Sequence, residues 1–546
     1  MHRFLLLLVL LSPVVLHAQI VNVEKIDSFT VADLQAQIDG FGAGALISAE
    51  NAVDLYRVTY MTEYLDSMVP VSGAMAVPRG VTCPSPLIVY HHGTVARREN
   101  VPSYGSAEGR LSTIIAATGY ATIAPDYIGL GSSDVRIHPY VHTFSQAHSA
   151  INQIRATRQL ADSLDVRIND QLLLLGYSQG GHATMATHKT IQEMYPGEFT
   201  VTASAPMAGP QDVAGVQADV LTSFDPYPTP GYLPYIVLAY KEMYPTLFAD
   251  YDPEDIFVPP YDSLMPALFY GHQNGMGTIN GQSTPVPRDM VLPSEIDSFL
   301  SDPNHPLQVA LEDNTLIDWA PQAPVHILHC SGDDQVTYAN AVVADSAWRA
   351  NGAPDVQVTD LGGGNHTDCV PLAVLAARGF LFPFNNQGID IVVDYDEATN
   401  SFSASLNGDD ITDGYTVEWT GGVAGTTLTG VQSGVPYRVD VTSDAGCTAR
   451  KDITLESVLA GGRDERPVLD VAVRPNPART EVRIDLPDGV PAARYTIMAT
   501  DGRIVRTGHC LSGGPIDVRD LAPGVYHLSG EDPVAGGRFV RVLVKQ

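Results

Sequence analysis

Lysine, tryptophan and cysteine are all scarce in this chain of 546 residues, which has five lysines, three tryptophans and five cysteines. Acidic residues outnumber basic ones 62 to 31, so the formal net charge is -31 at pH 7. Such a chain repels phosphate backbones and anionic lipid surfaces, and its scattered lysines form no polybasic membrane anchor. The composition therefore excludes a nucleic-acid-binding protein.

The few cysteines stand far apart in the sequence and form no CxxC pair, which argues against a metal cluster and against a fold built on disulfides. Long apolar runs are missing too. The apolar stretch near the start is too short to span a bilayer, and residues 1–18 have the basic start, apolar middle and small final residue of a signal peptide. We therefore expect an exported protein, secreted or at the cell surface, that passes through the periplasm and has no stable transmembrane anchor.

Residues that can form folded cores are abundant, since hydrophobic residues make up 45% of the chain and charged residues 17%. Its length predicts three or four domains. From about residue 52, apolar strands alternate with helical stretches, and Leu172 to Leu175 is apolar on both alternations, as in a strand covered on both faces. We predict an α/β domain over 19–385 with a mostly parallel central sheet.

The alternation stops between about residues 210 and 320, in a segment dense in proline and aromatic residues. We interpret it as a cap insertion over the edge of the sheet. This segment can form a second small core held by tyrosines, line an apolar substrate cleft, or do both. After about residue 385 the chain changes to short alternating strands. These predict an all-β module over 386–458, a linker over 459–467 and a second β module over 468–546.

A nucleophile motif follows the strand Leu172 to Leu175 directly. Gly176-Tyr177-Ser178-Gln179-Gly180 has the pattern G-x-S-x-G at a strand-to-helix turn. The turn strains the serine backbone, and glycine is needed on either side because a Cβ would collide with neighbouring backbone. Ser178 is therefore the predicted catalytic nucleophile.

A serine nucleophile needs a base, and the base needs an acid that holds it in the right tautomer. Asp333 follows the predicted strand Val325 to His329 and is the predicted acid. His366, in a glycine-rich loop, is the predicted base. The order Ser, Asp, His along the chain is the one that α/β-hydrolases use. For the oxyanion hole we expect backbone donors from Gln179, just after the serine, and from Thr94, after the strand Pro86 to Tyr90.

Several alternatives stay open at this point. Asp334 could replace Asp333 as the acid, and His182 is a less suitable base because it lies one helical turn after Ser178. His138, His142 and His148 suggest a metal site, although their spacing fits a loop and a helix start better, so we expect no metal. Cys330 and Cys369 flank the acid and the base, and they form either a bracing disulfide or two buried thiols.

These segments together resemble known proteins. The stretches YHHGT (90–94), DYIGLGSSD (126–134), HPY (138–140), GYSQGG (176–181), DWAPQAPVHILHCSGDDQV (318–336) and GGNHTDC (363–369) resemble the α/β-hydrolase superfamily and, more narrowly, secreted lipases and esterases related to fungal secretory lipases. The resemblance covers about residues 50–385. It implies hydrolysis of triacylglycerol or other carboxylic esters, with Ser178, Asp333 and His366 as the triad and the insertion as a lid.

The C-terminal part carries two further resemblances. The stretch from about Tyr415 to Leu455 is similar to small immunoglobulin-like repeats of bacterial surface proteins. The motifs VRPNPA (473–478), ATDGRIV (499–505) and LAPGVYHL (521–528) look like the sorting domain that directs cargo to the type IX secretion system. That resemblance implies the type IX machinery as a partner.

Three functional hypotheses follow. The first is a secreted serine hydrolase that cleaves small-molecule or lipid esters through an acyl-enzyme, with no cofactor. The second keeps the fold and the triad but cleaves peptides, as prolyl oligopeptidases do. The third is a surface adhesion or binding protein in which the hydrolase domain is inert. The set of Ser178, Asp333 and His366 favours the first hypothesis, as does a cap without a cluster of charges for a peptide terminus.

Overall fold

The computed structural model describes residues 18–40, 47–459, 471–474, 478–486, 492–499, 504–521, 524–531 and 538–545. The expected signal peptide lies outside the described residues except for Ala18. So does the expected linker except for Leu459, and each of the three sorting-domain motifs falls partly outside them.

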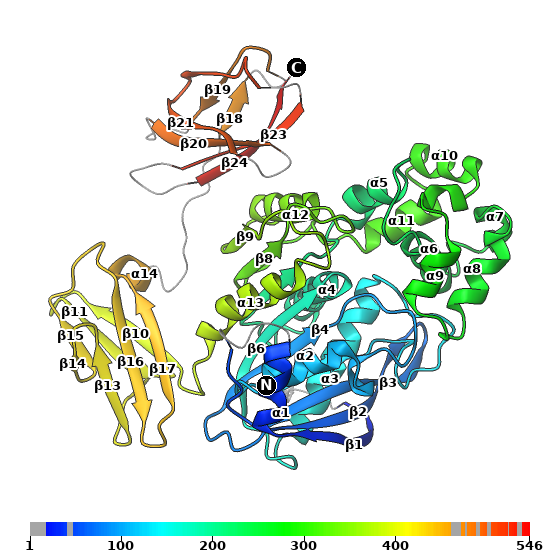
Figure 1. The fold of residues 1–546 in the computed structure, drawn as a ribbon. Helices are drawn as coiled ribbons and strands as arrows, with labels where there is room; N and C mark the ends of the chain where they lie inside the picture. Colours follow the sequence, from blue (N-terminus) through cyan, green and yellow to red (C-terminus); the bar gives the residue numbers. More distant parts are fainter. Residues whose placement is uncertain are drawn as a thin grey trace, which may run out of the picture.

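A nine-stranded mixed sheet forms the centre of the first part of the chain (Figure 1). Its strands are β1 (Ile20–Phe29), β2 (Val53–Tyr64), β3 (Ser67–Pro78), β4 (Ser85–His91), β5 (Thr122–Pro125), β6 (Ile168–Tyr177), β7 (Ala203–Met207), β8 (Val325–His329) and β9 (Val356–Asp360). The spatial order is β1-β2-β3-β5-β4-β6-β7-β8-β9. The six neighbouring strands β5-β4-β6-β7-β8-β9 pair in parallel, whereas β1, β2 and β3 add an antiparallel edge.

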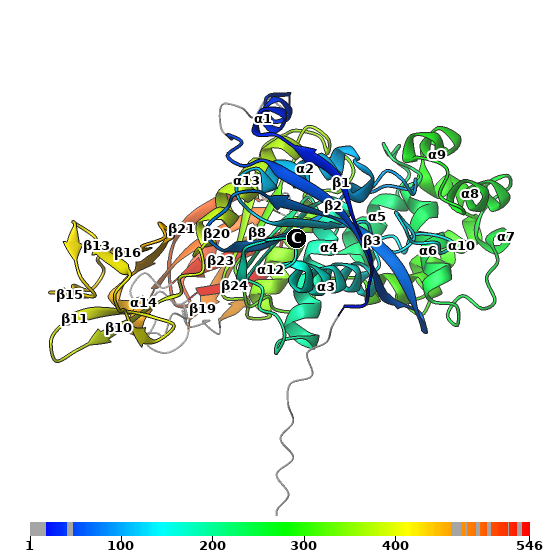
Figure 2. The same ribbon diagram turned by 90° about the horizontal axis from the view of Figure 1, so that it is seen from below.

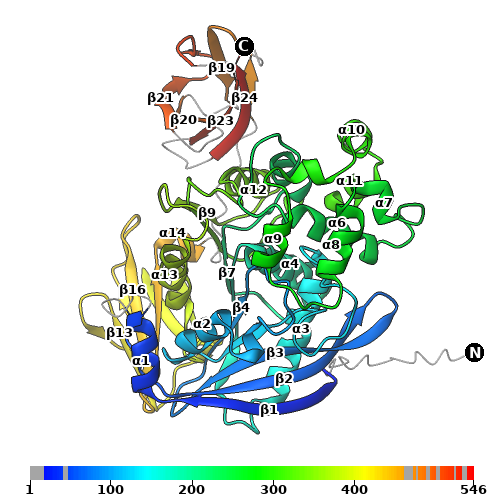
Figure 3. The ribbon, with the colours of Figure 1, turned by 45° about the vertical axis from the view of Figure 1, so that its right-hand side comes forward.

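Helices cover both faces of this sheet (Figure 3). On one face lie α3 (Thr143–Leu160), α4 (Gln179–Met194) and α12 (Ala339–Ala350); on the other lie α1 (Val31–Gly40), α2 (Ala107–Ala116) and α13 (Val370–Leu381). Leu172 and Leu174 of β6 pack into the first core, and Leu173 and Leu175 into the second. A strand apolar on both alternations therefore fills two cores, and the expected mostly parallel α/β domain is confirmed.

The cap between β7 and β8 is helical. Its helices are α5 (Ala218–Leu221), α6 (Tyr232–Met243), α7 (Pro253–Ile256), α8 (Tyr261–Phe269), α9 (Met276–Gln282), α10 (Pro293–Ser301) and α11 (Pro306–Asp313). They enclose a core of their own, which also takes in Ala96, Ile137, Tyr140 and Val141 from loops that follow β4 and β5. The cap therefore lies over the carboxyl ends of the strands, where Figure 2 shows it at the opposite end of the molecule from β10–β17.

The next part is a β-sandwich, with strands β10 (Ile391–Asp396), β11 (Ser401–Leu406), β12 (Asp409–Asp410), β13 (Tyr415–Trp419), β14 (Val423–Ala424), β15 (Thr427–Thr429), β16 (Tyr437–Ser443) and β17 (Thr448–Ile453), followed by α14 (Leu455–Leu459). Two four-stranded sheets pack around Phe402 and Trp419, whose rings stack 6.2 Å apart. A disulfide between Cys83 and Cys447 ties this sandwich to the loop before β4, at the amino ends of the parallel strands.

A second all-β part follows, with strands β18 (Ala472–Arg474), β19 (Glu481–Asp485), β20 (Ala492–Ala499), β21 (Ile504–Leu511), β22 (Pro515–Asp517), β23 (Gly524–Glu531) and β24 (Arg538–Lys545). They form one three-stranded and one four-stranded antiparallel sheet around a shared apolar core. In the part of the chain that the structure describes, no helix is long and apolar enough to cross a membrane.

Candidate active site

Ser178 lies at the sharp turn between β6 and α4, where it caps the helix. Its backbone has φ 59° and ψ -122°, a strained conformation for a residue with a side chain. The neighbouring glycines are required by contact. A Cβ at Gly176 would stand 2.3 Å from the carbonyl oxygen of Gly180, and one at Gly180 would stand 2.0 Å from that of His91. The turn predicted from the motif is therefore present, with its serine at the carboxyl end of a central strand.

Asp333 lies in the loop after β8 and accepts four hydrogen bonds. Its Oδ2 faces Nδ1 of His366 at 2.6 Å and Nε2 of His329 at 3.2 Å, while its Oδ1 accepts from the backbone amides of Gln335 and Val336 at 2.9 Å each. Burial alone would raise the pKa of Asp333, but the hydrogen bonds from the two histidines hold it well below its ordinary value. Asp333 is therefore a fixed, ionised carboxylate.

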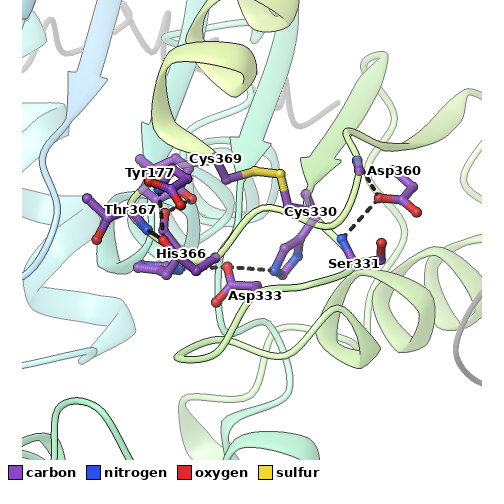
Figure 4. Close-up of a disulfide and its surroundings, with 12 residues drawn as sticks. Tyr177, Cys330, Ser331, Asp333, Asp360, His366, Thr367 and Cys369 are labelled. Carbon is purple, nitrogen blue, oxygen red and sulfur yellow. Dashed lines mark hydrogen bonds and ion pairs between the residues drawn. A yellow bond between two sulfur atoms is a disulfide. The ribbon is translucent and has the colours of Figure 1, made fainter.

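His366 belongs to the loop between β9 and α13, and its main chain is held on both sides. Its backbone amide donates to Oδ1 of Asp334 at 3.1 Å, and its carbonyl accepts from the hydroxyl of Tyr177 at 2.6 Å. Figure 4 shows Tyr177, His366 and Asp333 side by side. Because Asp333 accepts from Nδ1, Nε2 is left as the basic nitrogen. Asp334 thus holds the backbone of His366, and Asp333 holds its ring.

Tyr177 links the two loops: it directly precedes Ser178, and its ring lies 5.0 Å from the imidazole of His366, centroid to centroid. Both Ser178 and His366 are 6% exposed. The loops after β6, β8 and β9 therefore bring the serine, the carboxylate and the histidine to the same edge of the sheet. This edge is where open α/β sheets bind their ligands.

The two residues expected to supply oxyanion donors lie near the serine. Gln179 is the first residue of α4 and directly follows Ser178. A Cβ at Gly93 would stand 3.9 Å from Cβ of Ser178, so the turn that carries Thr94 passes close to the nucleophile. The hydroxyl of Thr94 lies 3.0 Å from that of Tyr140, which ties this turn to the loop after β5.

The other candidate histidines have different partners. His182 uses both ring nitrogens, on the side chain of Gln146 at 2.9 Å and the carbonyl of Asn314 at 2.8 Å, so it has no nitrogen left for a proton transfer. His138 faces the side chain of Gln179 at 2.7 Å, and His142 and His148 bind neighbours on or beside α3. Among the described residues, no three His, Cys, Asp or Glu side chains gather as a metal site would require.

Cys330 and Cys369 form a disulfide, which settles an alternative that the sequence left open. Cys330 lies three residues before Asp333, and Cys369 three residues after His366, at the start of α13. Both cysteines are fully buried. The bridge therefore joins the loop of the carboxylate to the loop of the histidine (Figure 4).

We expect the paired substitution Cys330→Ser/Cys369→Ser to lower the free energy of unfolding by about 4 kcal/mol, the chain-entropy value for a loop of this length. It should also lower kcat roughly tenfold, because small displacements of a base are costly. Cys83→Ser/Cys447→Ser is the matched control, since its bridge lies at the other end of the strands. Thermal unfolding and ester turnover measure both effects. An unchanged kcat in the first variant would show that the bridge has no part in holding the base.

Comparison with known proteins finds lipases and esterases. A family model described as secretory lipase matches residues 108–252, from the first turn of α2 into the cap. The esterase LipA of Xanthomonas oryzae, a rice cell wall degrading enzyme, is 27% identical with a TM-score of 0.60, over 67% of this chain and 98% of LipA. The chain contains an α/β-hydrolase fold.

Other solved structures support the same fold. A protein from Legionella pneumophila is 26% identical with a TM-score of 0.62, over 67% of this chain and 98% of the Legionella chain. Candida antarctica lipase A, in its closed state, is 16% identical with a TM-score of 0.52, over 67% of this chain and 81% of the lipase, and supports the fold alone. Among curated proteins, none matches the chain.

Sequence reasoning missed three contacts of this α/β-hydrolase site. His329 was predicted only as the last residue of a strand, and in the structure it also contacts Asp333. Tyr177 was only a variable position of the motif, yet it holds His366. His138 faces the side chain of Gln179. Nothing in the sequence showed that the loop after His329 would turn back over the strand end and bring Asp333 to it.

Proposed function

We propose that this protein is a serine hydrolase that cleaves carboxylic esters through Ser178, His366 and Asp333. The observation that carries the proposal is the 2.6 Å contact between Asp333 and Nδ1 of His366, at the same sheet edge as a serine in a strained strand-to-helix turn. The similarity to secretory lipases and to an esterase supports an ester as the substrate.

In the proposed reaction, Oγ of Ser178 attacks the ester carbonyl carbon while Nε2 of His366 takes the hydroxyl proton. Asp333 stabilises the imidazolium that forms. The backbone amides of Gln179 and Thr94 bind the oxyanion of the tetrahedral intermediate. Collapse breaks the bond to the alkoxide oxygen, which leaves with the proton from His366. A water molecule, deprotonated by His366, then attacks the carbonyl carbon of the acyl-enzyme. Collapse of this second intermediate breaks the bond to Oγ of Ser178, which takes the proton back from His366, and the acid is released.

The test is turnover of nitrophenyl esters of graded acyl length beside peptide nitroanilides, with wild type and Ser178→Ala. We expect the wild type to cleave the esters and the variant to be inactive. The preferred acyl length would show whether lipids such as triacylglycerols or short esters are the substrate. Faster cleavage of the anilides than of the esters would favour a peptidase, and inactivity of the wild type on both would contradict the proposal.

The two adjacent aspartates give a sharp comparison. Asp333→Asn is expected to lower kcat by about 10⁴-fold, because the amide no longer favours the tautomer with a basic Nε2. Asp334→Asn keeps an oxygen that can accept from the backbone of His366, so a loss of less than about tenfold is expected. Steady-state kinetics on one ester measure both. Equal losses of kcat would mean that Asp333 and Asp334 do not have these separate roles.

We propose further that the protein is exported, that β10–β17 form an immunoglobulin-like module and that residues 468–546 are a sorting domain for type IX secretion. Two disulfides support an oxidising destination. Fusion of residues 468–546, behind a signal peptide, to a periplasmic reporter should bring the reporter to the surface of a host with that system. Retention of the reporter in the periplasm would contradict this.

A further inference from the structure

A second histidine contacts the carboxylate that holds His366. His329 is the last residue of β8 and is fully buried. Its Nε2 lies 2.8 Å from the carbonyl oxygen of Val336 and 3.2 Å from Oδ2 of Asp333. Its Nδ1 is buried and, in this structure, has no hydrogen-bond partner.

These contacts fix the tautomer of His329. A carbonyl oxygen can only accept, so the hydrogen must lie on Nε2, which then donates to Val336 and Asp333 together. Nδ1 carries no hydrogen, because a buried N–H without an acceptor would cost more than a bare nitrogen. His329 therefore donates to the carboxylate as a neutral imidazole. It does not neutralise the charge of Asp333 as an imidazolium would.

His329 and His366 share one oxygen of Asp333. Oδ1 is occupied by the two backbone amides, so the carboxylate stays in place whichever donors bind Oδ2. A second donor on Oδ2 takes up part of the negative charge that would otherwise stabilise an imidazolium at His366. The bond to His366 is thereby weaker than it would be with a single donor.

Resting on the proposed triad, we propose that His329 is a positioning residue that acts through Asp333 and sets the pH at which His366 takes up its proton. Because His329 shares Oδ2, His366 stays unprotonated at a lower pH than it would with Asp333 to itself, and it can still act as a base there. This role goes beyond the triad itself, in which the carboxylate needs only one histidine partner.

Other groups face the same atoms and must be kept unchanged in a test. Those near Asp333 are Tyr177 of β6 and Tyr227 and Tyr232 of the cap, and those near His329 are Tyr338 at the start of α12 and Asp360 at the end of β9. None of the tyrosines changes charge near neutral pH, because burial raises the pKa of each. The pKa of Asp360 is lowered, since hydrogen bonds from Gly362 and Ser331 outweigh its burial.

The test uses the full chain with His329→Leu, which removes the donor, and His329→Gln, which keeps an N–H at similar reach. His326→Leu is the control, because His326 lies on the same strand and bonds to Thr359 at 2.7 Å, away from Asp333. Two readouts are taken: the pH profile of kcat/KM on nitrophenyl butyrate, and titration of the ¹³Cε1 signal of His366, assigned with His366→Gln.

In His329→Leu, we expect the acid limb of the profile and the midpoint of the His366 signal to move up by roughly 0.5 to 1 pH unit. His329→Gln should stay near wild type, and His326→Leu should not move. A midpoint that stays or moves down in His329→Leu would overturn the inference, even if kcat falls. If His329→Leu does not fold, His329→Asn, too short to reach Oδ2, must give the same upward shift.

The two readouts separate this inference from the proposed function. If the wild type cleaves no ester but the His366 midpoint still moves up in His329→Leu, the proposed function fails and the role of His329 stands. If esters are cleaved through Ser178 and the midpoint does not move, the proposed function stands and the role of His329 fails.

Discussion

Ser178→Ala is expected to lower kcat for ester hydrolysis by about 10⁴- to 10⁶-fold, the range found when a serine nucleophile that acts as part of a triad is removed. The physical reason is that alanine lacks the hydroxyl oxygen that attacks the ester carbonyl carbon. The residual rate would come from binding and from the oxyanion donors alone. Initial rates with a nitrophenyl ester, corrected for the uncatalysed reaction, measure the loss.

His366→Ala should give a loss of similar size, and the double variant should be hardly worse than either single one, because the two residues act as a unit. Ser331→Ala is a suitable control: Ser331 is an exposed serine in the loop of Asp333, and the substitution keeps its backbone amide, which donates to Asp360. Additive losses in the double variant, or a loss below about a hundredfold for Ser178→Ala, would mean that Ser178 is not the nucleophile.

The second large effect is on stability in acid. Burial lowers the pKa of five histidines of the hydrolase fold, to about 3 for His91, His138 and His188, and to about 4 for His142 and His182. The unfolded chain binds protons at these residues near pH 6.5, but the folded chain does not. Their contribution to stability is therefore complete above pH 6.5 and is lost as the pH falls toward the folded-state values.

At pH 5, each such histidine should remove about 2 kcal/mol of the free energy of unfolding, so the five together remove about 10 kcal/mol. That is comparable to the whole stability of a typical domain. Two other charge effects differ from this loss in sign or in pH range. Acidification relieves the repulsion of a chain with net charge -31. The pKa of Asp333 is lowered, so its contribution is lost only well below its usual range.

Denaturant unfolding from pH 8 to pH 5 measures this loss. We expect a plateau above about pH 7 and a steep fall below pH 6. His188→Asn should make the slope below pH 6 shallower by about one proton, or about 1.4 kcal/mol per pH unit, because asparagine does not titrate and its amide can still meet the hydroxyl of Ser204. A stability that is level from pH 7 to pH 5 would contradict the expectation.

The parts of the fold that were predictable are those in which local pattern and burial coincide. Leu172 to Leu175 predicted a doubly covered strand because all four side chains are apolar, and they fill both cores. β1 and β9 were missed. β1 is an edge strand whose side chains are mostly exposed and half polar, and β9 is a short edge strand with alternating polar residues, so neither carries the apolar signal of a central strand.

The cap shows a different limit. The sequence predicted an insertion dense in proline and aromatic residues without assigning its helices. Prolines begin α7, α10 and α11, where the first turn needs no N–H. The ends of β7 are likewise set by its pairing with β6 and β8. Tertiary pairing decides such ends, and the sequence alone does not display it.

At the site, the strained turn at Ser178 was predictable because only glycine fits on both sides of it. The disulfide between Cys330 and Cys369 and the division of roles between Asp333 and Asp334 were left open, since both depend on how two distant loops meet. The contact of His329 with Asp333 and the bridge from Cys83 to Cys447 were not anticipated, because a sequence separation of four or of 364 residues says nothing by itself about closeness.

In the proposed mechanism, Ser178 is a nucleophile activated by the pair of His366 and Asp333. This activation can be tested by mass spectrometry of the protein after reaction with a fluorophosphonate, which labels only activated serines. We expect one phosphonyl group per chain, on the peptide that contains Ser178, and a much slower reaction in His366→Ala. A label on another serine, or equal rates in the two proteins, would contradict it.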